Sequence, residues 1–118
     1  MTTANVTMSV RMVDKRTAIL DIHGEINAYA ESILMDAYNQ ASANGAQVIV
    51  LDFNDLKYMN SSGIGLLVTL LIRVRRQNQR LLAYGLTEHY QQIFQLTRLN
   101  EAISIYPDEA AAVQAANS

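Results

Sequence analysis

Two adjacent serines at the expected start of a helix are the residues of this sequence best suited to chemistry. The apolar run Gln47–Phe53 leads through a polar stretch to Asn60, Ser61 and Ser62, and a second apolar run follows. The first N–H groups of a helix lack partners within it, and the helix dipole is positive there. A phosphate on Ser61 would add about −1.5 to −2 charges where exposed amides can receive it. Ser61 is therefore a candidate phosphoacceptor; the alternative is that these residues only cap the helix.

Two glycines, Gly63 and Gly65, fall in the first turn of the same expected helix. Glycine in a helix interior costs about 1 kcal/mol relative to alanine, and less at a helix end. Their presence indicates that something approaches the backbone closely. Either the helix packs tightly on a sheet here, or a partner or a nucleotide lies against the turn.

Enzymatic and metal chemistry find little support in the residues. Ser61 does not lie in a G-x-S-x-G turn, His23 and His89 stand alone, and the chain has no cysteine. The third glycine of a dinucleotide-binding fingerprint is replaced by Val68, and no P-loop motif occurs. The sequence predicts that the protein is not an enzyme and has no catalytic residue, no metal site and no cofactor.

Charged residues near this segment allow two explanations each. Asp52 and Asp55 could bind a divalent cation, but such residues more often cap a strand end and begin a turn. A basic group could contact phosphates, but it is better explained as complementing the negative end of its helix; its members are Arg73, Arg75, Arg76 and Arg80.

Composition limits the class of protein. The chain has 118 residues, is 50% apolar and 17% charged, and has a net charge of −2, which predicts one globular domain over residues 1–118 without affinity for nucleic acid or anionic lipid. The N-terminus shows no signal-peptide pattern, and the apolar run Ile64–Ile72 is too short to cross a membrane. We therefore expect a cytoplasmic protein.

Hydrophobic periodicity predicts nine elements in the order ββαβαβαβα. Gly24 is expected to end the second strand, Asn44-Gly45 to end the first helix, and Thr87 and Asp108 to cap the last two helices. The expected elements are Val6–Val13, Thr17–Ile22, Asn27–Ala43, Gln47–Phe53, Ser62–Gln77, Arg80–Tyr84, Glu88–Leu96, Ile103–Tyr106 and Glu109–Ala116.

This order predicts an α/β sandwich. Its mostly parallel sheet would have about five strands with an antiparallel N-terminal edge hairpin, covered by about four helices. On the helix Ser62–Gln77, helical spacing places Ile64, Val68 and Leu71 toward the sheet. Leu66 and Leu70 would lie on the outer side, either as part of a protein interface or beneath another helix.

Four segments resemble one known family. LDFNDLKYMNSSGIGLLV resembles the motif of the bacterial anti-sigma factor antagonists, the STAS domains, in which an apolar strand ends in Asp and a short loop leads to S-(S/T)-G-(I/L)-G and an apolar helix. HGEINAYA resembles the G-E-(I/L)-D segment of that family. IFQLTRLNEAISIY and DEAAAVQA resemble its closing stretch. The resemblance covers nearly the whole chain and agrees with the predicted element order.

The resemblance implies a function in bacterial transcription regulation. Such proteins have no catalytic activity and bind a serine-kinase anti-sigma factor, which frees the sigma factor. It implies that the kinase phosphorylates Ser61, that the phosphorylated form releases the kinase, and that a PP2C-type phosphatase resets it. No nucleic acid, membrane or essential small molecule is implied. The expected partner-binding residues are Asn27, Asn60, Ser62, Gly63, Ile64, Gly65 and Leu66.

Two positions depart from the family pattern. Asn60 and Asn27 stand where the family often has Asp, so two negative charges are lost while hydrogen-bonding side chains of similar shape remain. Kinase contacts that used those carboxylates would be weakened. Two other functions stay open: a constitutive scaffold subunit of a stressosome-like or lipid-transport complex, in which Ser61 is only a cap, and a small-molecule or nucleotide sensor that uses the Gly63–Gly65 turn.

Overall fold

The computed structural model describes residues 5–118. The first four residues belong to the N-terminal stretch without a signal-peptide pattern and lie outside the described residues. The elements along the chain are β1 (Val6–Met12), β2 (Thr17–Ile26), η1 (Ala28–Ala30), α1 (Glu31–Ala43), β3 (Val48–Met59), α2 (Ser61–Arg76), β4 (Arg80–Tyr84), α3 (Glu88–Leu96), η2 (Leu99–Glu101), β5 (Ser104–Tyr106) and α4 (Glu109–Ala116).

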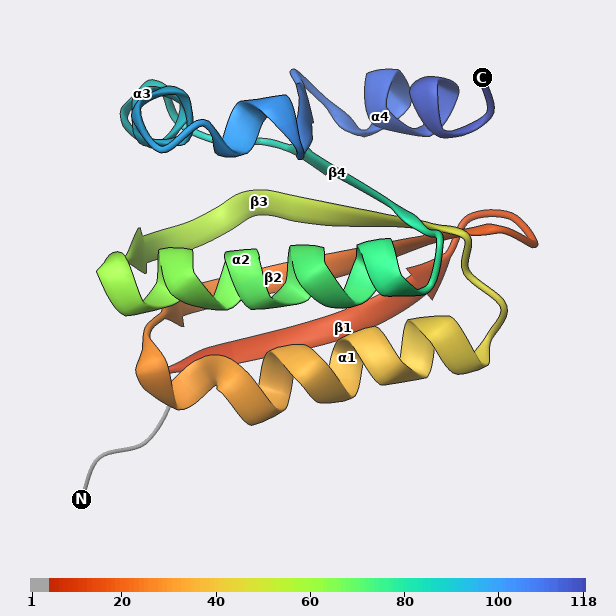
Figure 1. Ribbon diagram of the computed structural model, residues 1–118, viewed down its shortest axis with the longest axis horizontal. Helices are drawn as coiled ribbons and strands as arrows, with labels where there is room; N and C mark the ends of the chain where they lie inside the picture. Colours follow the sequence, from red (N-terminus) through yellow and green to blue (C-terminus); the bar gives the residue numbers. More distant parts are fainter. Residues whose placement is uncertain (1–4) are drawn as a thin grey trace.

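The five strands form one sheet in the order β1-β2-β3-β4-β5. β1 and β2 are joined by a short turn and pair antiparallel, whereas β2, β3, β4 and β5 pair parallel because a helix crosses over between each pair. This arrangement confirms the predicted fold class. Figure 1 shows α1 and α2 lying side by side along the strands, with α3 and α4 beyond them near β4.

The two faces of the sheet are covered unequally. The larger apolar core lies between one face and the helices α1, α2 and α3, and includes Leu34, Leu67 and Phe94. The smaller core lies on the other face and is covered by α4, where Ala112 packs with Tyr84. Since α4 spans only Glu109–Ala116, part of this second face stays free of helices.

Two central strands are longer than the sequence predicts. Gly24 does not end β2, which continues to Ile26 with a register shift on either side of Gly24. Gly24 has φ +108° and lies across from Val6, so the glycine allows a bulge inside the strand. β3 continues through residues 54–59, in which polar and apolar side chains are mixed, to Met59. Pairing with the extended β2 overrides the weak strand propensity of that segment.

The orientation of α2 differs from the helical-wheel prediction. Leu66 and Leu70 are buried in the large core, and Val68 is 40% exposed. The prediction places Val68 toward the sheet and leaves open whether another helix covers Leu66 and Leu70; in the structure α2 also packs against η1 and α1. These contacts turn the leucine side inward, so the second explanation for Leu66 and Leu70, cover by another helix, is correct.

Helix ends follow the predicted chemistry with two exceptions. Gly45 ends α1 with φ +91°, and the Asp108 side chain accepts a hydrogen bond from Ala111 N at 2.9 Å. Thr87 precedes α3 but its side chain makes no capping hydrogen bond. The predicted helix Asn27–Ala43 begins instead with the short 3-10 turn η1, which Asn27 caps through Tyr29 N at 2.9 Å.

Candidate functional site

Ser61 is the first residue of α2 and its side chain is exposed. Asn60 adopts an extended conformation, and its side-chain oxygen accepts a hydrogen bond from Gly63 N at 2.9 Å. Asn60 is therefore the cap, and neither serine is needed for that task. The N–H groups of Ser61 and Ser62 are left without partners within the helix. An exposed hydroxyl thus lies at the positive end of a 16-residue helix.

The junction between β3 and α2 is held from both sides. Asn60 N donates to the carbonyl oxygen of Ile26 in β2 at 3.3 Å, and Met59 N donates to the hydroxyl of Tyr90 in α3 at 2.9 Å. A β-carbon on Gly63 would lie 2.3 Å from the Ile26 oxygen. Tight packing therefore explains this glycine.

Gly65 has a different environment from Gly63. A β-carbon placed on Gly65 would meet no atom within 4 Å, and the residue is exposed. No packing contact in the described residues requires a glycine at this position. Tight packing, the first of the two explanations offered by the sequence, therefore does not account for Gly65.

One face of α2 forms an exposed stripe that begins at Ser61. Ser61, Gly65, Val68 and Ile72 recur at helical spacing and all are exposed, Ile72 to 46%. Two aromatic side chains near this stripe are also exposed. Tyr58 lies three positions before Ser61 in the sequence, and Tyr29 belongs to η1, which packs on α2. This α2 stripe, Ser61, Gly65, Val68 and Ile72, therefore places two exposed apolar side chains on the same side of the helix as the Ser61 hydroxyl.

The predicted partner-binding residues divide into three groups. Ser62 and Gly65 are exposed; Asn27, Asn60 and Ile64 are partly exposed; Gly63 and Leu66 are buried. Five of the seven are therefore at least partly exposed, so their role in partner binding stays a prediction. Gly63 and Leu66 lie in the interior and support the helix.

Sequence reasoning missed three residues of this region. The helical-wheel prediction places Val68 toward the sheet and assigns Ile72 to neither side. Their helical spacing from Ser61 nevertheless indicates that they share its side of α2. Tyr90 carries no local signal, because its hydroxyl reaches Met59 across 31 positions of sequence.

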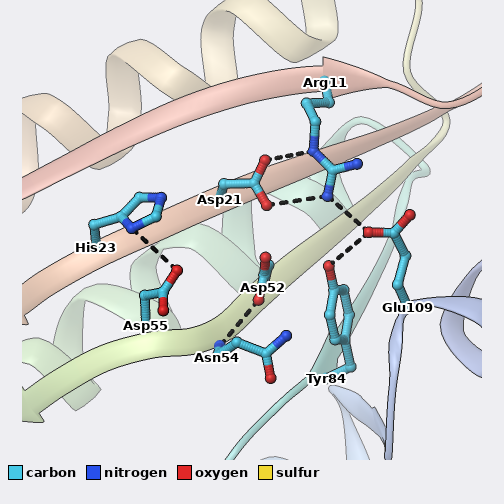
Figure 2. Close-up of polar contacts among 8 residues, drawn as sticks. All are labelled: Arg11, Asp21, His23, Asp52, Asn54, Asp55, Tyr84 and Glu109. Carbon is cyan, nitrogen blue, oxygen red and sulfur yellow. Dashed lines mark hydrogen bonds and ion pairs between the residues drawn. The ribbon is translucent and has the colours of Figure 1, made fainter.

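Polar side chains gather on the second sheet face where α4 begins (Figure 2). The guanidinium of Arg11 donates to Asp21 at 3.1 Å and to Glu109 of α4 at 2.8 Å, and the Tyr84 hydroxyl donates to Glu109 at 3.1 Å. Hydrogen bonding to Arg11 lowers the pKa of both Asp21 and Glu109. Burial and the nearby Asp52 raise the pKa of Tyr84, so it stays a hydrogen-bond donor. This cluster fastens α4 to the sheet.

Asp52 lies directly across from Asp21 on the neighbouring strand. Burial, reinforced by Asp21, raises the pKa of Asp52 from 3.8 to about 6. The folded protein therefore favours the neutral carboxyl. The stability that this contributes is complete below about pH 4 and is lost as the pH rises through about 6.

Asp52→Asn is expected to raise the free energy of unfolding at pH 7.5 by about 1 kcal/mol, because the partly exposed carboxylate is screened by solvent. At pH 4 the variant and the wild type should differ little. Urea denaturation at the two pH values measures the effect. The same stability difference at both pH values would contradict the assignment.

The acidic residues that follow the apolar part of β3 and the two histidines contact neighbouring residues. Asp52 accepts a hydrogen bond from Asn54 N at 2.9 Å, and Asp55 pairs with His23 at 3.2 Å, as Figure 2 shows. Within residues 5–118 no three His, Cys, Asp or Glu side chains are grouped to hold a metal ion. His89 stacks edge-on against Tyr90. No helix in the described part of the chain has the length and apolar character needed to cross a membrane.

The basic residues of α2 lie where the helix dipole is negative. Arg73, Arg75 and Arg76 occupy its last turn. Arg80 starts β4 and donates to the carbonyl oxygens of Ala115 and Ala116 at 3.2 and 3.4 Å. These contacts favour helix-end complementation over phosphate binding.

Comparison with known proteins identifies the family. Residues 10–112 match the family model of the STAS domain. The chain belongs to the STAS domain family. Among curated STAS relatives, the anti-sigma-B factor antagonist of Listeria monocytogenes is 27% identical over 100 residues, which cover 83% of this chain and 88% of that protein.

Solved structures share the fold of this STAS domain. An anti-sigma factor antagonist from Mycobacterium paratuberculosis has a TM-score of 0.81 and 18% identity, with 99% of this chain and all of that chain covered. SpoIIAA, a Bacillus cell fate determinant solved in its phosphorylated form, has a TM-score of 0.71 and 20% identity, with 92% and 99% covered. At these identities the likeness establishes the fold alone.

Proposed function

We propose that this STAS domain is a cytoplasmic, non-catalytic anti-sigma factor antagonist. It binds a serine-kinase anti-sigma factor through the start and the exposed stripe of α2. Phosphorylation of Ser61 by that kinase releases the complex, and a PP2C-type phosphatase restores the binding form.

The exposure of the Ser61 hydroxyl at the first position of α2 carries this proposal. A kinase needs a hydroxyl that it can reach, and Ser61 is exposed while Asn60 does the capping. The unpartnered N–H groups of the first turn can receive the added negative charge, so the fold tolerates the phosphate. The same charge lies on the α2 stripe, where a docked partner would have to bury it.

The comparisons support the anti-sigma factor antagonist role, and the choice of Ser61 rests on the geometry of α2. The Listeria relative is named an anti-sigma-B factor antagonist, and SpoIIAA of the same fold exists in a phosphorylated form. Asn60 and Asn27 both cap turns through their side-chain oxygens at 2.9 Å. The amides at these two positions therefore cap turns without the negative charge of the Asp that the family often has there.

The decisive experiment maps the phosphate. The protein is incubated with ATP and a serine-kinase anti-sigma factor encoded by a neighbouring reading frame, and phosphopeptides are sequenced by mass spectrometry. We expect phosphate on Ser61 in the wild type and in Ser62→Ala, and none in Ser61→Ala. Phosphate on neither serine, together with stable incorporation into a large assembly, would instead indicate a constitutive scaffold subunit.

A nucleotide or small-molecule sensor has less structural support. Gly63 is buried against Ile26, and a hollow of about 680 Å³ lies elsewhere, on the second sheet face beside His23 and Asp55. Heat on titration with ATP or GTP, without kinase present, would revive that function.

A further inference from the structure

The end of β3 extends beyond its neighbour β4. β4 pairs with β3 from Val48 to Asp52, and no other strand of residues 5–118 pairs with residues 53–59 on that side. Backbone N–H groups that point toward the missing strand need another acceptor, because unpaired buried donors are costly. This unpaired edge leads directly into Ser61.

Tyr90 of α3 supplies that acceptor at the last residue of β3. Its hydroxyl oxygen accepts a hydrogen bond from Met59 N at 2.9 Å, and both residues are buried. The next backbone N–H, of Asn60, points the opposite way and donates to Ile26 of β2 at 3.3 Å. Two consecutive N–H groups therefore fix the backbone from α3 on one side and from β2 on the other.

We propose that Tyr90 is a positioning residue for Ser61. Its hydroxyl fixes the β3–α2 junction and thereby sets where the Ser61 side chain lies relative to the free N–H groups of the first turn of α2. The part of this inference that concerns phosphorylation rests on the proposed function; the positioning itself does not.

Three contacts depend on the same short segment. Met59 N bonds to Tyr90, Asn60 caps α2 through Gly63, and Gly63 packs against the Ile26 carbonyl, where even one methyl group has no room. Loss of the Tyr90 hydroxyl leaves Met59 N–H buried without an acceptor. The junction then relaxes toward solvent, and Ser61 moves with it. Tyr90→Phe keeps the ring, so the packing of α3 is retained.

Because the chain has no cysteine, a thiol introduced at one position can be measured without background from other thiols. Ser61→Cys introduces a single thiol at the start of α2, where unpaired N–H groups stabilise the thiolate and lower its pKa below the free value of about 8.5. The rate of alkylation by iodoacetamide, measured from pH 5.5 to 9.5, gives that pKa. Adding Tyr90→Phe is expected to raise the thiol pKa by about 0.5 and to speed amide exchange at Met59 at least about tenfold.

Tyr38→Phe in the same Ser61→Cys background is the matched control. The Tyr38 side chain is also buried and its hydroxyl donates to Gln79 at 2.7 Å, but this bond lies near the C-terminal end of α2. We expect no change in the thiol pKa and no change in amide exchange at Met59. Equal shifts in the two variants, or no shift with Tyr90→Phe, would overturn the positioning role.

The positioning role of Tyr90 and the phosphorylation of Ser61 are tested by different measurements, so either can be contradicted without the other. The thiol titration needs no kinase, so it tests Tyr90 even if Ser61 is never phosphorylated. If Ser61 is phosphorylated, Tyr90→Phe should reduce the kinase kcat/KM more than Tyr38→Phe does. Equal losses in the two variants would contradict the inference while leaving the proposed function intact.

Discussion

Replacing Gly63 with alanine is expected to lower the free energy of unfolding by about 3 kcal/mol. The added methyl group would lie 2.3 Å from the Ile26 carbonyl oxygen and 2.8 Å from the Met59 side chain. The backbone oxygen belongs to β2 and cannot move without disturbing the sheet, so the start of α2 must shift. Urea denaturation of the wild type and the variant measures this cost.

Gly65→Ala is the matched control for this prediction. The two glycines lie two positions apart in α2, and an added methyl group at Gly65 meets nothing within 4 Å. Alanine is the better helix former, so Gly65→Ala should be neutral or stabilise the protein by about 0.5–1 kcal/mol. Similar losses of stability in both variants would contradict the packing described for Gly63.

Ser61→Asp is expected to weaken binding of the kinase partner by about 100-fold, which corresponds to about 2.7 kcal/mol. The aspartate places a charge on the α2 stripe, and a docked partner would bury that charge without a counter-ion. The melting temperature should change little, because a negative side chain is tolerated at a helix N-terminus. Isothermal titration calorimetry gives the affinity and circular dichroism gives the melting temperature.

Ser62→Asp is the matched control, because it shows whether the loss of affinity depends on where the charge is added or only on the added charge. It adds an identical side chain to the same helical turn at an exposed position, but away from the line of Ser61, Gly65 and Val68. We expect a loss of affinity at least tenfold smaller than for Ser61→Asp, about 1.4 kcal/mol less. If both variants bind as tightly as the wild type, a charge on this turn does not control docking.

The architecture could be predicted from the sequence because it depends on repeated local patterns. Alternation in Val6–Met12, the β-branched run that becomes β3, and the glycine at position 45 each mark one element, and right-handed crossovers arrange them. The second half of β3 could not be predicted in this way. Its residues 54–59, which mix polar and apolar side chains, are held by pairing with β2 through a register that includes two shifts.

The candidate site could be predicted in part. Ser61 and the Asn60 cap follow from local helix-end chemistry, which is a property of a few adjacent residues. The exposed side of α2 depends on contacts with η1 and α1, so the sequence leaves two explanations open for Leu66 and places Val68 toward the sheet, which is wrong. Tyr90 depends on α3 packing beside an unpaired strand edge, and no pattern near Tyr90 or Met59 encodes that contact.

The most direct test compares one protein in two states. The chain is prepared without phosphate and with phosphate on Ser61, confirmed by mass spectrometry, and each form is titrated calorimetrically into the serine-kinase anti-sigma factor. The account predicts that the unmodified form binds and that the phosphorylated form binds at least about 100-fold more weakly. Equal affinities would show that Ser61 does not govern docking.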